Sequence, residues 1–240
     1  MKESRTVQVY ATNWRQYLAG EPVGDWLLLP ATKEQVAGEV QHLGGSYRIH
    51  DMKLPKKLQF LQECIVETTS LEDLNLVVAQ LSGLDTWQLE AVELYCSQKY
   101  QQSANLLPLC NLVSQSNQLP FSMYGTKASS ASNVYEKLGL TLLEERGKLM
   151  QLEAMGMTPY INAGAYGLDC AKKEGLLPGP TGYLYQGELG GLETRYSRAD
   201  LERQVEDLLE SPTQVEQSVI EAPGMEERDS LELENPGKRL

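Results

Sequence analysis

The stretch VQVYAT, Val7 to Thr12, decides the fold of the first region. Its apolar residues alternate with more polar ones, and this period of two is typical of a strand with one buried face. A polar turn rich in Gly20, Glu21 and Pro22 follows. Residues 23–29 then predict a second, more buried strand.

A helix and a third strand complete this region. Thr32-Lys33-Glu34-Gln35 is a capping-box pattern, with Thr32 as N-cap and Gln35 reaching back to it. The pair Gly44-Gly45 ends the predicted helix. Residues 46–52 predict the third strand, so the first region reads as a small α+β unit.

The next region predicts an αα-hairpin. Ser70 caps a helix whose acidic first turn, Glu72 and Asp73, suits the helix dipole. Gly83 ends that helix, and a capping box that begins at Asp85 starts a second one, which extends to about residue 100.

Residues 101–190 predict a mixture of elements. A helix over 104–113 is interrupted by Pro108, and residues 126–133 read as a loop that ends in a helix cap. Helices over 134–146 and 163–174 and a strand over 182–186 follow. Gly139 lowers the helix propensity of the first of these helices by up to about 1 kcal/mol relative to Ala.

The last fifty residues differ in composition. Ser197-Arg198-Ala199-Asp200 is a capping pattern, and Leu201, Val205 and Leu208 follow it at helical spacing. This predicts one amphipathic helix that ends at Ser211-Pro212. Residues 212–240 are rich in Glu, Pro and Ser, which predicts disorder.

The fold class is therefore α+β, and we expect three small domains in series. The predicted boundaries are 1–67 for an α+β domain, 68–133 for a helical domain, 134–190 for a second α+β domain, and 191–240 for an acidic helix and tail.

The chain is acidic, with a formal net charge of -12. Residues 1–70 are neutral, 71–100 carry -4, 101–135 carry +1, 136–190 carry -2, and 191–240 carry -7. Such a chain repels phosphate backbones and anionic lipids, so we expect no direct binding to nucleic acid or membrane. The excess charge either attracts a basic groove or serves only solubility.

The sequence predicts a soluble cytoplasmic protein, because no apolar run approaches the roughly 20 residues of a membrane span. The N-terminus lacks a secretory h-region. The four cysteines form no CxxC pair, so we expect them to be reduced and buried.

No stretch carries a motif for catalysis. His42 and His50 are the two histidines, eight residues apart, which is poor spacing for a metal site. The sequence has no GxSxG elbow, no phosphate-binding GxxxxGKS/T loop and no GxGxxG. We therefore expect a protein that is not an enzyme and that uses no metal and no cofactor.

Several stretches together carry a family resemblance. Tyr10–Trp26, Ser70–Asn75, Asn133–Gly147, Tyr160–Asp169 and Gly182–Tyr185 occur in the order in which similar segments occur in ArdA antirestriction proteins. The chain resembles that family over roughly residues 6–187. At the fourth segment, Asn162, Ala163 and Leu168 stand where the family pattern has Asp, Tyr and Arg.

The resemblance implies an elongated homodimer that mimics DNA. Such a protein occupies the DNA-binding groove of type I restriction-modification enzymes without catalysis. The acids expected to contact that partner are Glu72, Asp73, Asp85, Glu90, Glu93, Glu144, Glu145 and Asp169. One alternative is a non-catalytic binding module directed at another defence or regulatory protein. A second is an undetected enzyme with a pocket beside Asp169.

Overall fold

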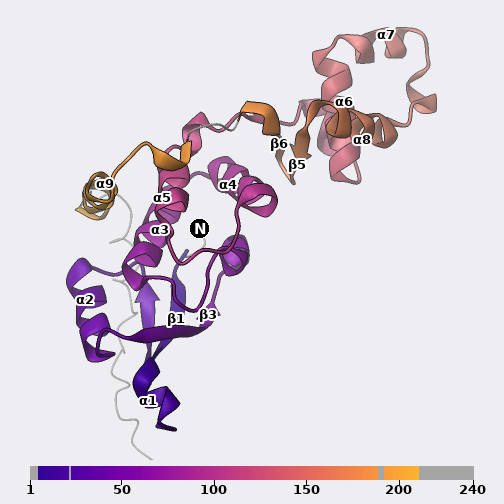
Figure 1. Ribbon diagram of the computed structural model, residues 1–240. Helices are drawn as coiled ribbons and strands as arrows, with labels where there is room; N and C mark the ends of the chain where they lie inside the picture. Colours follow the sequence, from indigo (N-terminus) through magenta and orange to yellow (C-terminus); the bar gives the residue numbers. More distant parts are fainter. Residues whose placement is uncertain (1–4, 22, 189–191, 211–240) are drawn as a thin grey trace, which may run out of the picture. The chain divides into compact units, whose positions relative to one another are not determined.

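The computed structural model describes residues 5–21, 23–188 and 192–210, and within them helices and short strands are mixed (Figure 1). This confirms the predicted α+β class. The described residues up to Leu209 cluster as one compact unit. The three-domain boundaries and the elongated arrangement stay predictions.

The first sheet has three antiparallel strands: β1 (Val7–Asn13), β2 (Gly24–Leu29) and β3 (Tyr47–Lys53). Their order is β2-β1-β3, so the stretch that opens the chain is the central strand. Val7, Val9 and Ala11 are fully buried, which confirms the alternation read from the sequence.

Helix α2 (Lys33–His42) begins at the predicted capping box. The Gln35 amide N–H donates to Thr32 Oγ1, and the Gln35 side chain accepts from the Thr32 amide. Gly44 and Gly45 both have φ of 69°, which ends the helix without a Cβ penalty. Local pattern and structure agree throughout this segment.

The predicted polar turn after β1 contains a helix that sequence reading missed, α1 (Trp14–Leu18). Asn13 caps it, because its Oδ1 accepts hydrogen bonds from the amides of Arg15 at 3.0 Å and Gln16 at 3.1 Å. An Asn cap supports a single short turn of helix even where no apolar period marks one.

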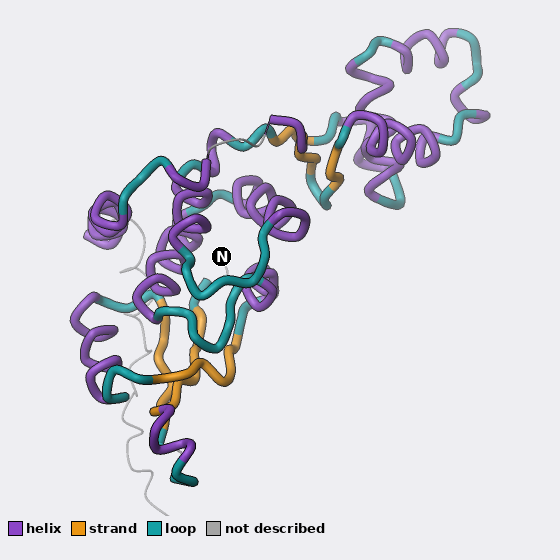
Figure 2. The backbone as a smooth tube through the Cα atoms, in the orientation of Figure 1, coloured by secondary structure: helices purple, strands orange, loops and turns teal. Residues whose placement is uncertain are grey.

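The middle of the chain is helical, as predicted. It contains the 3₁₀ helix η1 (Lys56–Glu63) and the α-helices α3 (Leu71–Gly83), α4 (Thr86–Lys99) and α5 (Leu107–Ser114). Figure 2 distinguishes these helices, in purple, from the strands of the first sheet, in orange. Helix α5 begins at Leu107, later than predicted, because Pro108 fits the first turn of a helix and is not an interruption there.

Helix α3 is buried on nearly all sides, which its sequence does not reveal. Even Asn75 is buried, and its side-chain amide pairs with both backbone groups of Ala31 at 2.8 and 2.9 Å. A buried amide is tolerated when its donors and acceptors are satisfied. Asn75 therefore fixes α3 against the segment between β2 and α2.

The third region combines a second sheet with three helices. Its elements are β4 (Phe121–Met123), α6 (Val134–Glu145), α7 (Lys148–Ala154), α8 (Ala163–Glu174), β5 (Leu176–Pro178) and β6 (Gly182–Tyr185). The sheet order is β4-β6-β5, all antiparallel. Of these strands, sequence reading predicted only β6.

Two glycines let α6 and α8 cross at close range. A Cβ added to Gly139 would lie 1.9 Å from the Ala163 carbonyl oxygen. A Cβ added to Gly167 would lie 2.0 Å from the Tyr135 carbonyl oxygen. Gly139 lowers the helix propensity of α6, but the close packing of α6 against α8 requires a residue without a Cβ at this position.

Helix α9 (Arg198–Glu210) confirms the predicted C-terminal helix. The amide of Asp200 donates to Ser197 Oγ, as the capping pattern required. Leu201 and Val205 are buried in the same apolar cluster as α3. Residues 212–240, predicted to be disordered, lie outside the described residues.

Short 3₁₀ helices connect the remaining segments. They are η2 (Ser116–Gln118), η3 (Thr126–Ser130), η4 (Thr158–Tyr160), η5 (Gln186–Glu188) and η6 (Leu192–Thr194). None of the helices in the described part of the chain is long and apolar enough to cross a membrane.

Candidate partner-binding surface

The first turn of α3 carries two acids that differ in burial: Glu72 is half-buried and Asp73 is buried. Ser70 Oγ donates to Glu72 at 2.7 Å and accepts from the Asp73 amide at 3.2 Å. The Asp73 side chain is buried and forms an ion pair with Arg198 of α9. In this structure Asp73 therefore faces a cation of its own chain rather than solvent.

On α4, Glu90 is also turned inward. Its carboxylate accepts hydrogen bonds from Thr181 Oγ1 at 2.6 Å, the Thr181 amide at 2.8 Å and the Gly182 amide at 3.3 Å. Glu90 is 7% exposed, so these three donors replace its water. Glu90 joins α4 to the start of β6.

Glu93 lies one helical turn after Glu90 and is exposed. Partial burial, together with the neighbouring charge of Glu90, raises the pKa of Glu93 above its ordinary value. Asp85 is exposed at the start of α4, where it forms a capping box with Gln88. Both carboxylates can therefore be reached by a partner.

The end of α6 carries adjacent exposed acids, Glu144 and Glu145. The Tyr183 hydroxyl donates to Glu145, with oxygen distances of 3.2 and 3.3 Å. Burial is the main cause that raises the pKa of Tyr183, and the charge of Glu145 contributes to the same shift. Among the described residues, neither carboxylate forms an ion pair.

Three other acids of the third region have a cation of the same chain beside them. Arg146 donates to both oxygens of Glu174 at 2.7 Å, and Lys173 pairs with Asp169 at 2.7 Å. Lys127 pairs with Glu153 at 3.2 Å. The predicted contact residue Asp169 thus has a cation beside it, although its side chain remains exposed.

The structure sorts the eight predicted contact acids by exposure. Asp73 and Glu90 are buried, Glu72 is half-buried, and five are exposed: Asp85, Glu93, Glu144, Glu145 and Asp169. The contact role of each acid stays a prediction. Asp73 and Glu90, however, are not presented at the surface in this structure.

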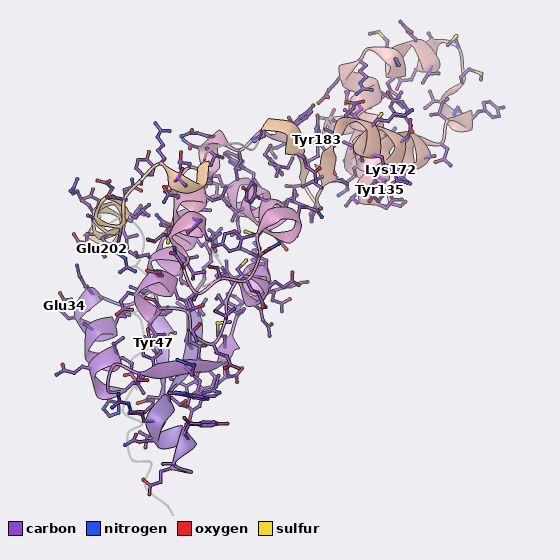
Figure 3. The ribbon with its side chains drawn as sticks, viewed as in Figure 1. Glu34, Tyr47, Tyr135, Lys172, Tyr183 and Glu202 are labelled. Atoms are coloured by element: carbon purple, nitrogen blue, oxygen red, sulfur yellow. The ribbon has the colours of Figure 1, made fainter. Side chains whose placement is uncertain are left out.

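A group of charges that sequence reading missed lies where α9 meets α2 and α3. A cleft of about 150 Å³ is lined by Lys33, Glu72, Arg198, Glu202 and Glu206 together with apolar residues. Lys33 Nζ contacts Glu202 at 3.0 Å, and Figure 3 shows Glu202 of α9 facing the helix that carries Glu34. The capping pattern at Ser197 predicted α9 but not where it docks.

The two histidines are on different elements, His42 in α2 and His50 in β3, as predicted. Within the ranges that the structure describes, no group of three or more His, Cys, Asp or Glu residues could hold a metal ion. The absence of a metal or cofactor stays a prediction from the sequence.

Comparison with known families agrees with the resemblance. The sequence finds no match among curated proteins. The family model described as antirestriction protein (ArdA) matches residues 9–185, which spans both sheets and helices α1 to α8. Because this match covers well over half of the 240 residues, the chain belongs to the ArdA family of antirestriction proteins.

Proposed function

We propose that this protein is a DNA mimic that occupies the DNA-binding groove of type I restriction-modification enzymes. The observation that carries the proposal is the family match over residues 9–185. The mode of action is competition, so the chain performs no catalysis and needs no cofactor. A protein partner, rather than nucleic acid, fits a chain with a net charge of -12.

Exposed carboxylates without a cation beside them are the proposed contacts. Glu93, Glu144 and Glu145 meet this condition, and Asp85 is exposed as well. A carboxylate that has no partner in its own chain can form a charge-assisted hydrogen bond with Arg or Lys of a DNA-binding groove. An acid already paired, such as Asp169 with Lys173, must give up that contact first.

The test is an inhibition assay with a type I restriction-modification enzyme and its DNA. The full chain at excess is expected to reduce both DNA binding and DNA cleavage, and inhibition should weaken as salt rises. Unchanged binding and cleavage at excess protein would reject the proposal.

A matched pair of variants tests which carboxylates matter. The triple variant Glu93→Gln, Glu144→Gln and Glu145→Gln is expected to inhibit at least tenfold less well, if each contact contributes about 0.5–1 kcal/mol. The control is Glu21→Gln, Glu63→Gln and Glu67→Gln, three exposed acids outside the predicted set. Equal loss in both variants would mean that bulk charge, not these positions, drives inhibition.

A second candidate is a binding module for another defence or regulatory protein. The internal pairing of Asp73, Glu90, Asp169 and Glu174 favours it, because fewer acids remain to imitate phosphates. Capture from a host lysate distinguishes the two candidates. Recovery of restriction-modification subunits would reject this second candidate.

We also propose that the protein is a homodimer. Large apolar side chains gather on α7 and the residues after it, where Met150, Met155 and Tyr160 are 72%, 65% and 79% exposed. Exposed apolar groups of this kind favour association. Light scattering on the purified chain should give twice the mass of 26.8 kDa, and a monomer at all concentrations would contradict the proposal.

A further inference from the structure

The buried lining of the cleft between α2, α3 and α9 is apolar. Each helix supplies one buried side chain to this floor: Val36, Leu76 and Val205. Asn75 also lines the cleft, but both backbone groups of Ala31 already engage its side-chain amide. The cleft measures about 150 Å³, and a cavity of about this volume holds a group the size of benzene. The floor therefore suits one small apolar group.

Two cations line the cleft, and each already has a carboxylate of its own chain beside it. Lys33 Nζ lies 3.0 Å from Glu202. Arg198 forms the ion pair with the buried Asp73, and a second nitrogen of its guanidinium lies 3.7 Å from Glu202. An anionic ligand would therefore have to displace one of these carboxylates.

Two further acids of the lining, Glu72 of α3 and Glu206 of α9, form no ion pair with any residue that the structure describes. The hydrogen bond and charge of Glu202 raise the pKa of Lys33, and the charges of Glu206 and Glu34 add to this shift. Two cations thus stand against five acids at or beside the cleft, which are Glu34, Glu72, Asp73, Glu202 and Glu206. The surroundings of the cleft are negative.

An apolar floor below a negative rim selects a particular kind of ligand. Lys and Arg side chains combine an aliphatic stem with a cationic end, so the stem can pack on apolar surface while the charge stays at the rim. A carboxylate such as Glu72 or Glu206 forms a charge-assisted hydrogen bond with that cationic end. Phosphates and carboxylates are disfavoured by charge, and a neutral polar group finds few partners on the floor.

We propose that this cleft accepts an Arg or Lys side chain of the protein partner. The inference rests on the proposed function, because a groove that binds DNA presents Arg and Lys to the phosphates. Val205 and Glu206 belong to α9, which lies outside the family-matched residues 9–185. The matched segment alone therefore does not form this cleft.

The first test uses the isotope-labelled full chain and n-butylguanidine, which has a short aliphatic stem and a guanidinium end. Nuclear magnetic resonance should show saturable shifts confined to amides of α2, α3 and α9, with a dissociation constant on the order of a few millimolar. The control compound n-butylurea has the same shape without the charge and should give no saturable shift. Guanidinium chloride has the charge without the stem and should bind more weakly than n-butylguanidine.

A matched pair of variants tests the two carboxylates. The double variant Glu72→Gln and Glu206→Gln should bind n-butylguanidine about fivefold more weakly than the unsubstituted chain. The control double variant, Glu21→Gln and Glu63→Gln, removes as much charge at two exposed acids that do not line the cleft, and it should bind as the unsubstituted chain does. The inference is overturned if n-butylguanidine gives no localised shifts, if n-butylurea binds equally well, or if both variants lose the same affinity.

The second test measures inhibition of a type I restriction-modification enzyme by the same two variants. The cleft variant should inhibit about fivefold less well than the control variant, because one partner side chain loses its acceptors. The two proposals fail differently. An unsubstituted chain that does not inhibit rejects the proposed function. Equal inhibition by both variants, with no binding of n-butylguanidine, overturns the cleft as a contact and leaves the proposed function standing.

Discussion

The close crossing of α6 and α8 makes a strong prediction about Gly139. Ala is the best helix former, so Gly139→Ala should stabilise an isolated helix by about 1 kcal/mol. In this protein the added Cβ would instead lie 1.9 Å from the Ala163 carbonyl oxygen and 2.8 Å from its carbonyl carbon. These are backbone atoms, which cannot rotate away as a side chain can.

Relief of this overlap requires the two helices to move apart. Carbon atoms pack at about 3.5–4.0 Å, so the separation must grow by roughly 1.5 Å at the crossing. Overpacking typically costs 1–3 kcal/mol, and a contact with rigid backbone belongs at the upper end. We expect a net loss of about 3 kcal/mol, which lowers Tm by roughly 6–12 °C in a chain of this size.

Gly38 of α2 provides the matched control. It is also inside a helix, but a Cβ added there meets nothing within 4 Å. Gly38→Ala should therefore stabilise the protein by about 1 kcal/mol and raise Tm by roughly 2–4 °C. The same substitution thus has opposite signs at the two positions.

Thermal unfolding followed by circular dichroism measures both variants. The reasoning is refuted if Gly139→Ala raises Tm as Gly38→Ala does, because α6 and α8 would then not cross through glycine. Hydrogen exchange in α6 and α8 gives a second reading, and protection should fall there in Gly139→Ala but not in Gly38→Ala.

Three further predictions concern carboxylates. Glu90→Ala should cost about 3 kcal/mol in urea unfolding, because Thr181 and its neighbour lose a charged acceptor, and Glu90→Gln should cost less; equal stability to the parent would contradict this. Arg198→Ala should lower the free energy of unfolding by about 2 kcal/mol, because Asp73 would stay buried without a cation. Adding Asp73→Asn to this variant should recover part of the lost stability. If the losses from the two substitutions simply add, the ion pair does not stabilise the fold. Glu93→Gln should raise Tm slightly at pH 7, because a carboxyl whose pKa is raised in the folded state destabilises that state when it is ionised. The gain in Tm should disappear as the pH falls through the pKa of Glu93, where the carboxyl of the parent protein becomes neutral. A gain that persists at pH 3 would refute this cause.

Much of the fold could be predicted where local chemistry determines it. Thr32, Ser70, Asp85 and Asn133 all cap the helices that their patterns predicted. A cap acts within four residues, so its signal is contained in the sequence itself. The central strand β1 could also be predicted from the sequence, because a strand with one buried face alternates apolar and polar residues.

The missed elements depend on distant partners or on very short segments. Strands β4 and β5 have three residues each, too few for any period to show. They exist because β6 lies between them and satisfies their backbone groups. Helix α1 has five residues and no buried side chain, so its sequence has no apolar period that could predict a helix.

The candidate surface shows the same division. The sequence reveals how many acids each segment carries, but not which of them fold inward. Glu90 is buried by a contact with Thr181, ninety-one residues later, and Asp73 by Arg198 of α9. Exposure of a charge depends on tertiary structure, and no local spacing predicts it.

Helix α9 lies outside the segment that matches the family, yet it contributes side chains to the core of this protein. The segment shared with the family ends at residue 185, yet Leu201 and Val205 fill the interior around α3, and Asn111 bonds to both backbone groups of Tyr196. A gene shortened to the shared segment would encode a protein with an opened flank, lacking side chains that its own interior needs.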